Sequence, residues 1–293
     1  MAFIRKRIDL TFRLGTGSFG EGGSNTVKVS NCRVDAAIIQ THGLQGGTAQ
    51  VKVYGLTKSV MNQLSALNVD PNPIIQRNNT ILIEAGDMDS ALAIVFKGQI
   101  NLGQIDLSNP PFAALNVVAV AGSFIGVKPI PPSTYPDTAD AAVIMQNLAA
   151  QAGYTFENNG VSVILSTPYF PGTIKDQIEA CRRAAHINAY IENETTLAIW
   201  PIGASRKGEV VEISAGSGLI GYPSFSSGTG GLTFKTRFNP LLRIGNLVKV
   251  VSDLEVANRT WTALQIEHNL ESETPNGQWF TQFNGVVPYG NSK

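Results

Sequence analysis

Short strand-like runs dominate both ends of the 293-residue chain and constrain its fold more than any other feature. Apolar and polar residues alternate in these runs, as in a strand with one buried face, and glycine-rich turns separate them. Repeated short strands of this kind indicate a sandwich or a barrel. The runs are TVKVSNCRVDAAIIQ, GTAQVKVYGL, TILIEAG, ALAIVFKGQI and FAALNVVAVAG in the first part, and LIGYPSFSSG, GLTFKTRF, NLVKVVSD, RTWTALQIEHNLE and GQWFTQFNGVV in the last.

The middle of the chain has a different character. After a proline-rich stretch, KPIPPSTYPDT, the pattern predicts a helix that starts at Asp137 and ends at Gly153, with Asp140 completing a capping-box-like turn. A second helix is predicted with Thr173 as its cap and Asp176 at its third position. Strand-like runs follow each helix, which indicates a small α+β domain.

We therefore predict a mainly β fold with an α+β insert, in which two similar small β-barrel domains flank a small α+β domain. The N-terminal barrel is expected at residues 1–125 and includes one helix, from residue 57 to about 67, that stops at Asn68. The α+β domain is expected at 126–213 and the C-terminal barrel at 214–293.

Composition and charge narrow the classes of function. Hydrophobic residues make up 43% of the chain and charged residues 15%, which is typical of a globular protein with much of its surface buried in an assembly. Lys+Arg and Asp+Glu both number 22, so bulk charge gives no reason to expect binding of nucleic acid or of an anionic membrane. We see no signal peptide and no apolar run long enough to span a bilayer, and expect synthesis and assembly in a cytoplasm.

A glycine motif near the N-terminus suggests nucleotide binding at first sight. Residues 15–20, GTGSFG, have the G-x-G-x-x-G spacing of dinucleotide-binding loops. Such a loop needs a helix after it, because the helix N-terminus binds the phosphate. The following residues read as a turn and then a strand, so we interpret the motif as a long loop of a hairpin.

Candidate catalytic groups are few. We expect His42 to be a solvated loop residue, His186 to lie at a helix end, and His268 to be a core residue on the apolar face of a strand. Cys32 and Cys181 fit no metal spacing and are expected in the core rather than in a disulfide. No catalytic, cofactor-binding or metal-binding residue is assigned, and no cofactor is expected.

A pair of carboxylates keeps one enzymatic interpretation open. Glu192 and Glu194 look like part of a turn between two strands. Paired carboxylates cleave glycosides when they face a sugar across a cleft. An enzyme that degrades cell walls with carboxylates of the middle domain is therefore one alternative, and a glycan-binding attachment module is another.

Ordered motifs along the chain resemble those of a known family. The C-terminal part contains GLIGYP, which includes Pro223, then Asn239-Pro240-Leu241, and then Gly245 before a valine-rich strand. The last hairpin follows as WTALQIEHNLE and GQWFTQF, with His268 and Trp279. The N-terminal half agrees with AQVKVYGLTKSVMNQL, ILIEAG and IVFKGQI in that order. Together these motifs resemble the baseplate hub proteins of contractile-tailed phages and related injection machines.

The resemblance implies a structural role in the virion. Three copies would form a ring whose six similar barrels face the hexameric tail tube, with the trimeric central spike on the other face. Baseplate wedge and tape-measure proteins are further partners that it implies, with assembly in the host cytoplasm and no membrane or specific nucleic-acid binding. It carries over no catalytic residue; the motif residues that it marks as structural are Pro223, Asn239, Pro240, Gly245, His268 and Trp279.

Overall fold

The computed structural model describes residues 5–20, 23–44, 46–65, 78–108, 111–126, 129–226 and 231–288. Contacts within the chain divide it into two compact units. Unit 1 comprises Met1–Ile39, Gly47–Ala121 and Glu267–Thr281, and unit 2 comprises Gln40–Gly46, Gly122–Ile266 and Gln282–Lys293. The last two strands of the chain therefore contribute residues to both units.

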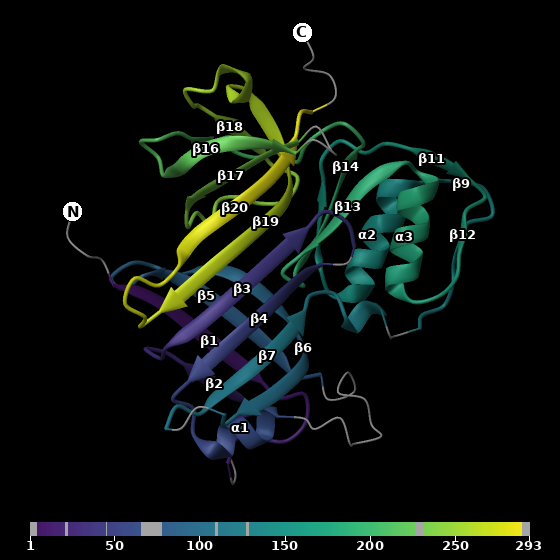
Figure 1. Ribbon diagram of the computed structural model, residues 1–293. Helices are drawn as coiled ribbons and strands as arrows, with labels where there is room; N and C mark the ends of the chain where they lie inside the picture. The colour runs from purple at the N-terminus through teal and green to yellow at the C-terminus, as the bar shows by residue number, and fades with distance from the viewer. Residues whose placement is uncertain are drawn as a thin grey trace. The chain divides into compact units, whose positions relative to one another are not determined.

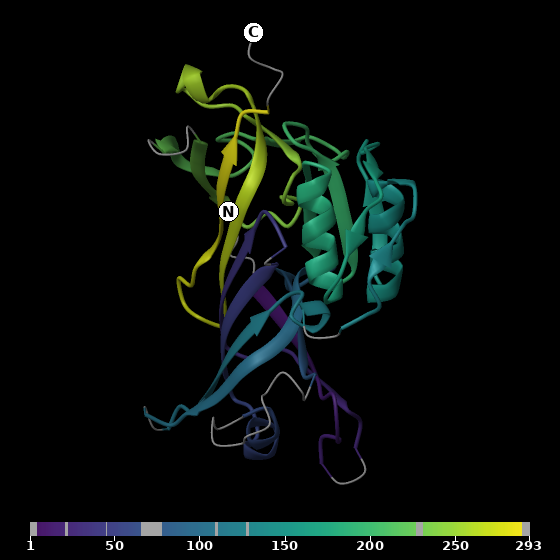
Figure 2. The same ribbon diagram turned by 90° about the vertical axis from the view of Figure 1, so that its right-hand side faces the viewer.

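Unit 1 is built on a sheet whose neighbouring strands follow the order β2-β1-β5-β6-β7-β4-β3. Pairing is antiparallel from β2 through β4, and β6 and β7, drawn in blue, run side by side in both views (Figures 1 and 2). The elements are β1 Lys6–Arg13, β2 Thr26–Val29, β3 Val34–Thr41, β4 Gly47–Tyr54, α1 Lys58–Leu64, β5 Thr80–Asp87, β6 Ala93–Asp106 and β7 Ala114–Val120.

The alternating sequence pattern places the core of unit 1 as predicted. In β3 the side chains of Val34, Ala36 and Ile38 are buried, whereas Asp35 and Ile39, at alternate positions, are exposed. This period of two gives the sheet one apolar face. Leu10, Phe12, Ile81 and Ile83 are fully buried, which shows where β1 and β5 contribute to the same core.

The glycine motif lies in a hairpin loop, as predicted. It connects β1 to β2, which pair antiparallel with Arg13 opposite Thr26. Two of its glycines adopt left-handed conformations, and the N–H of Gly15 donates to Oδ1 of Asn79 at 3.0 Å. Within its described residues no helix follows the motif, so the feature that binds phosphate in nucleotide sites is missing from them.

Unit 2 contains the predicted α+β segment. β10 Thr155–Asn158 runs parallel to β14 Thr196–Pro201, which pairs antiparallel with β13 Ile187–Glu192. The helices α2 Ala141–Ala152 and α3 Ile174–Ala184 bury apolar side chains, including Ile144, Leu148 and Ile178, against this sheet. Two short antiparallel pairs complete the segment: β8 Ser133–Thr134 with β12 Tyr169–Phe170, and β9 Thr138–Asp140 with β11 Ile164–Ser166.

Capping interactions of nearby residues determine where the helices begin and end, and two of the predicted helix ends are wrong. Thr173 and Asp176 form the predicted capping box of α3, and Gly153 ends α2 at a φ of 77°. The predicted start of α2 at Asp137 is wrong: Asp140 is itself the cap, because residues 138–140 are held extended as β9. The helix predicted from residue 57 to about 67 is α1, which Thr57 caps. It ends earlier than predicted, at Leu64, because Ser65 is extended; Asn68 lies outside the described residues.

The remainder of unit 2 is a second group of strands. Its order is β16-β17-β20-β19, with β18 paired antiparallel to β19 and parallel to β15. Within unit 2, β19 contributes residues up to Ile266 and β20 contributes residues from Gln282. The strands are β15 Val211–Ile213, β16 Leu219–Ser226, β17 Gly231–Arg237, β18 Leu247–Val250, β19 Thr260–Ser272 and β20 Trp279–Val286.

One core joins this group of strands to the α+β segment. Tyr190 and Trp200, from β13 and β14, pack with Trp261 and with Phe234 and Phe283, whose rings stack at 4.6 Å between centroids. The fold is mainly β with an α+β insert, as predicted. Three independent domains at 1–125, 126–213 and 214–293 stay a prediction.

The capping box generates a stability prediction. Thr173→Ala removes the bonds of its hydroxyl with Asp176, and we expect α3 to lose about 1 kcal/mol of local stability. Faster amide hydrogen exchange across residues 174–184 would measure this loss. Thr57→Ala is the matched control, because the Thr57 bond to the N–H of Val60 is 3.4 Å long and α1 has no acidic residue in its first turn. Unchanged exchange in Thr173→Ala would contradict the role given to the box.

Candidate functional site

The sequence motif residues Pro223, Asn239 and Pro240 lie at bends of unit 2. Pro223 is buried in β16, where the register with β17 shifts between Ile220 and Ser224. Asn239 and Pro240 follow β17, and Oδ1 of Asn239 accepts the N–H of Leu241 at 3.0 Å. This side-chain bond closes a turn whose backbone the proline stiffens.

Gly245 occupies the tightest position among the motif residues. Its φ is +82°, and a Cβ there would lie 2.8 Å from Cζ2 of Trp200 and 3.0 Å from Cγ and Cδ of Arg206. Its N–H donates to the carbonyl of Ala263 at 2.9 Å, and its carbonyl accepts the N–H of Arg206 at 2.8 Å. Glycine is required here both by the backbone conformation and by the close packing.

His268 and Trp279 belong to unit 1 and lie in different environments. His268 is buried in β19, and its Nδ1 lies 2.9 Å from Oγ1 of Thr281. Burial lowers the pKa of His268 to about 4, so the imidazole is neutral at pH 7. Trp279 is half-buried, with Nζ of Lys6 located 5.9 Å from its ring centroid.

The prediction that His42 is solvated is wrong. The His42 ring is half-buried and meets the Trp200 ring edge-on at 5.7 Å. Its Nε2 lies 3.0 Å from Oδ1 of Asn188, and burial lowers the pKa of the imidazole. The histidine therefore belongs to the packing of unit 2.

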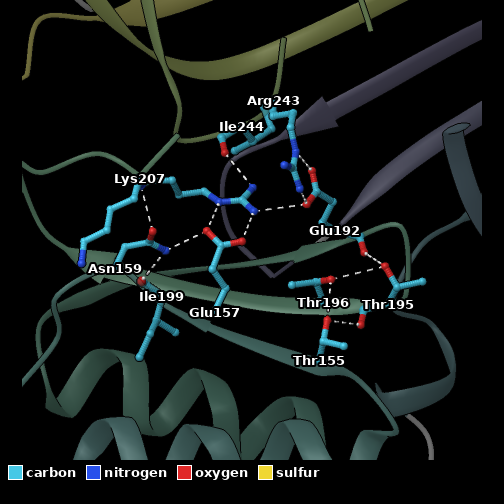
Figure 3. Close-up of polar contacts among 11 residues, drawn as sticks. Thr155, Glu157, Asn159, Glu192, Thr195, Thr196, Ile199, Lys207, Arg243 and Ile244 are labelled. Atoms are coloured by element: carbon cyan, nitrogen blue, oxygen red, sulfur yellow. Dashed lines mark hydrogen bonds and ion pairs between the residues drawn. The ribbon is translucent and has the colours of Figure 1, made fainter. Parts of the chain in front are cut away.

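The described part of unit 2 contains a cluster of four charged side chains that ion pairs join to one another. We name Glu157, Glu192, Arg206 and Arg243 the arginine–carboxylate cluster (Figure 3). Glu157 is on β10 and Glu192 ends β13, whereas Arg206 lies between β14 and β15. Arg243 lies between β17 and β18, two residues before Gly245. The cluster thus joins the α+β segment to the later strands of the same unit.

Arg206 is at the centre of the cluster. Its Nε and Nη2 bond both oxygens of Glu157 at 3.0 and 2.6 Å, and Nη2 also reaches Glu192 at 3.2 Å. Its Nη1 donates to the carbonyl of Ile244 at 3.2 Å. The side chain of Arg206 is only 1% exposed, so a charge that would be costly in isolation is balanced by carboxylates and hydrogen bonds.

The two carboxylates are satisfied from several directions. Arg243 donates to Oε1 of Glu192 at 2.8 Å and to its other oxygen, and the Glu192 side chain is 12% exposed. Nδ2 of Asn159 donates to Oε1 of Glu157 at 2.9 Å, while Oδ1 of Asn159 accepts the N–H of Lys207 at 2.8 Å. Two guanidinium groups and two carboxylates give a cluster with no net charge.

The pKa shifts of Glu157 and Glu192 favour a structural role for the cluster over a role as proton donor. The Arg206 guanidinium lowers the pKa of Glu157 against the opposing effect of burial. Burial raises the pKa of Glu192, but Arg243 and Arg206 outweigh it and the net shift is downward. Both carboxylates are therefore ionised at neutral pH, whereas an acid catalyst for glycoside cleavage needs a raised pKa.

The carboxylate pair named from the sequence has separate structural partners. Glu192 belongs to the cluster, whereas Oε1 of Glu194 accepts the N–H of Gly122 at 2.9 Å. The carbonyl of Glu192 accepts the N–H of Thr195, which closes the predicted turn between β13 and β14. Among the described residues, no three His, Cys, Asp or Glu side chains are grouped so that they could hold a metal ion. Both cysteines are free thiols, Cys181 buried and Cys32 half-buried.

Sequence reasoning missed the cluster itself. Glu157 and Arg206 are 49 residues apart, and no motif links them. The sequence held two partial signals: Glu192, which was noted only as one of a carboxylate pair, and Gly245, where a Cβ would contact Arg206. Of the described helices, none is long and apolar enough to cross a membrane.

Comparisons with known proteins give one family and several similar structures. The family model described as baseplate hub gp41 matches residues 9–282. No curated protein matches the chain in sequence. A tail protein from Neisseria meningitidis MC58 aligns with a TM-score of 0.58 and 10% identity, over 95% of this chain and 96% of that one.

Two further structures share the fold. The 43 kDa tail protein of prophage MuSo2 from Shewanella oneidensis aligns with a TM-score of 0.59 and 10% identity, over 96% of this chain and 97% of that one. The E. coli c3393 protein, a component of the type VI secretion system, aligns at 0.55 and 11% identity, over 89% of this chain and 75% of that one. That protein is described as similar in structure to the T4 tail proteins gp27 and gp5.

Close packing at Gly245 generates a stability prediction. Gly245→Ala should lower the free energy of unfolding of unit 2 by about 2–4 kcal/mol, from the left-handed φ and from overpacking against Trp200. Gly221→Ala is the matched control: its φ is +69° and a Cβ would meet nothing within 4 Å. The control should lose only the conformational part, about 1 kcal/mol. Equal losses in urea unfolding would contradict the steric argument.

The cluster generates a pH prediction. Because the folded-state pKa of Glu192 is below its ordinary value of 4.5, its contribution to stability is present above that pH and is lost as the pH falls through the folded pKa. Glu192→Gln should therefore cost about 2 kcal/mol at pH 7 and progressively less on acidification. Urea unfolding at pH 7 and pH 4 measures the difference.

An exposed ion pair provides the control for this pH dependence of stability. Glu212 and Lys249 are 2.9 Å apart with both side chains 53% exposed, so Glu212→Gln should change stability little at either pH. A Glu192→Gln loss that stayed constant with pH would show that the cluster is not held by ionised carboxylates.

Proposed function

The chain belongs to the baseplate hub gp41 family, and from this membership we propose that it is a structural, non-enzymatic hub of a phage tail. Three copies form a ring in which the β-rich parts of each copy, the predicted barrels at 1–125 and 214–293, give six similar barrels. One face of the ring meets the hexameric tail tube and the other carries the trimeric central spike. Baseplate wedge and tape-measure proteins are further partners, and the ring is assembled in the host cytoplasm into the virion.

The observation that carries the ring proposal is the edge strand β16. It stands at the end of its strand order, so among the described strands none pairs with one row of its backbone groups in that sheet. Its exposed side chains include Ile220, Tyr222 and Phe225, and Tyr222 is 67% exposed. An open edge with large apolar side chains is a site for pairing with another chain, and a soluble monomer normally protects such an edge.

β2, at the opposite end of the strand order, has features that protect an edge strand from pairing with other chains. β2 is only four residues long, and its Lys28 pairs with Asp9 at 3.0 Å and with Glu84 at 3.3 Å. Short edge strands that carry lysine discourage pairing with other chains. The contrast between β2 and β16 supports a specific interface at β16 rather than a general tendency to associate.

Structural placement of the motif residues fits the same proposal. Pro223 lies in β16 itself, and Asn239, Pro240 and Gly245 shape the connection between β17 and β18. His268 and Trp279 lie on the two strands that contribute to both units. We propose that these residues maintain the shape of the ring subunit, and we assign them no chemistry.

The ring proposal predicts the mass of the particle. Light scattering of the purified chain, with negative-stain images, should give three times the mass of one chain and a ring with a central hole. Tyr222→Lys should reduce assembly by at least about tenfold, because it places a charge in an apolar interface. Ile94→Lys is the matched control, since Ile94 is also exposed but lies on β6, an interior strand.

Two results would overturn the proposal. The first is a monomer that persists when the chain is co-expressed with its tail tube and spike proteins. The second is reproducible release of fragments from peptidoglycan by the purified chain, which would favour the alternative of a cell-wall-degrading enzyme.

A further inference from the structure

Unit 1 contains a groove that has no residue in common with the arginine–carboxylate cluster. It has a volume of about 560 Å³ and is formed by the start of β1 and the hairpin between β19 and β20. We name it the Trp279 groove; all of its lining residues belong to unit 1. The residues that matter for its chemistry are Arg5, Lys6, Glu271, Glu273, Asn276 and Trp279.

Trp279 gives the groove an aromatic wall. The chain has three tryptophans, and Trp200 and Trp261 are core residues that are 1% and 2% exposed. Trp279 is instead half-buried and lines an open volume. An indole in such a place can bind the apolar face of a ligand while keeping its polar edge near water.

The charges around the groove are balanced. Nε of Arg5 lies 2.7 Å from Oε1 of Glu273, and Nζ of Lys6 lies 2.5 Å from Oδ1 of Asp87. Both cations therefore already have carboxylate partners, which disfavours an anion as the ligand. The groove supplies acceptors and donors for hydrogen bonds without a net charge to select an ion.

The hairpin turn adds two further polar groups. Glu271 lies against it: a Cβ on Gly277 would be 3.1 Å from Oε2 of Glu271. Asn276 is exposed, and its left-handed φ of 54° belongs to the tight turn. The groove thus combines one aromatic wall, a carboxylate and an amide on a turn held by strand pairing.

We propose that the Trp279 groove binds an uncharged sugar unit of a glycan. The C–H face of the pyranose ring packs on the indole of Trp279. Ring hydroxyls donate to the carboxylate of Glu271 and accept from the guanidinium of Arg5 and the amide of Asn276. A ligand that presents one apolar face and many neutral hydroxyls fits this lining better than an ion or a purely apolar molecule.

Quenching of tryptophan fluorescence by acrylamide tests the proposal on the full chain. Because Trp200 and Trp261 are buried, the quenched signal comes mainly from Trp279, and Trp279→Phe should remove it. The probe is chitotriose, a neutral trimer of N-acetylglucosamine. It should reduce the quenching constant of Trp279 about twofold at saturation, with a Kd on the order of 1 mM or tighter.

Variants and a charged probe make the test decisive. Asn276→Gly keeps the left-handed turn and removes the amide, and Glu271→Ala removes the carboxylate; each should weaken chitotriose binding about tenfold. Asn193→Gly is the matched control, since Asn193 also has a positive φ, 48°, and does not line the groove. Three results would each overturn the proposal: no protection of Trp279 by chitotriose, affinity in the two groove variants unchanged from that of the unsubstituted chain, or tighter binding of an anionic galacturonate trimer.

Discussion

A buried guanidinium sets the constraint on which unit 2 depends. Arg206 cannot remain charged at 1% exposure without partners, and those partners come from elements distant in sequence. Glu157 and Glu192 approach from two strands of the α+β sheet, and the carbonyl of Ile244 approaches from the connection after β17. Satisfying one charge therefore fixes how these segments of unit 2 lie against each other. Gly245 completes the arrangement, because any larger residue would displace the arginine or Trp200.

Local patterns in the sequence predicted local structure well. The alternation in residues 34–41 gave the buried face of β3, and Thr173 with Asp176 gave the cap of α3. These features depend on neighbours a few residues away, so the sequence displays them directly. The start of α2 failed because residues 138–140 pair with residues 164–166, and no local preference reveals that bridge.

The candidate site could not be predicted for the same reason. Charged residues such as Glu157 and Arg206 normally lie at the surface, and nothing in their neighbourhood signals burial. His42 was assigned to solvent because it lies in a glycine-rich turn, yet its ring packs against Trp200, far along the chain. The ordered motifs, by contrast, pointed to the right family, since family resemblance is spread over most of the chain.

The division of β19 and β20 between the two units has a consequence for synthesis. Unit 1 takes Glu267–Thr281 from the end of the chain, although its other residues all lie before Gly122. A ribosome releases the chain from the N-terminus, so β3 waits for its neighbouring strand β19 until Thr260–Ser272 have emerged. Unit 1 is therefore completed only after most of unit 2 has been synthesised.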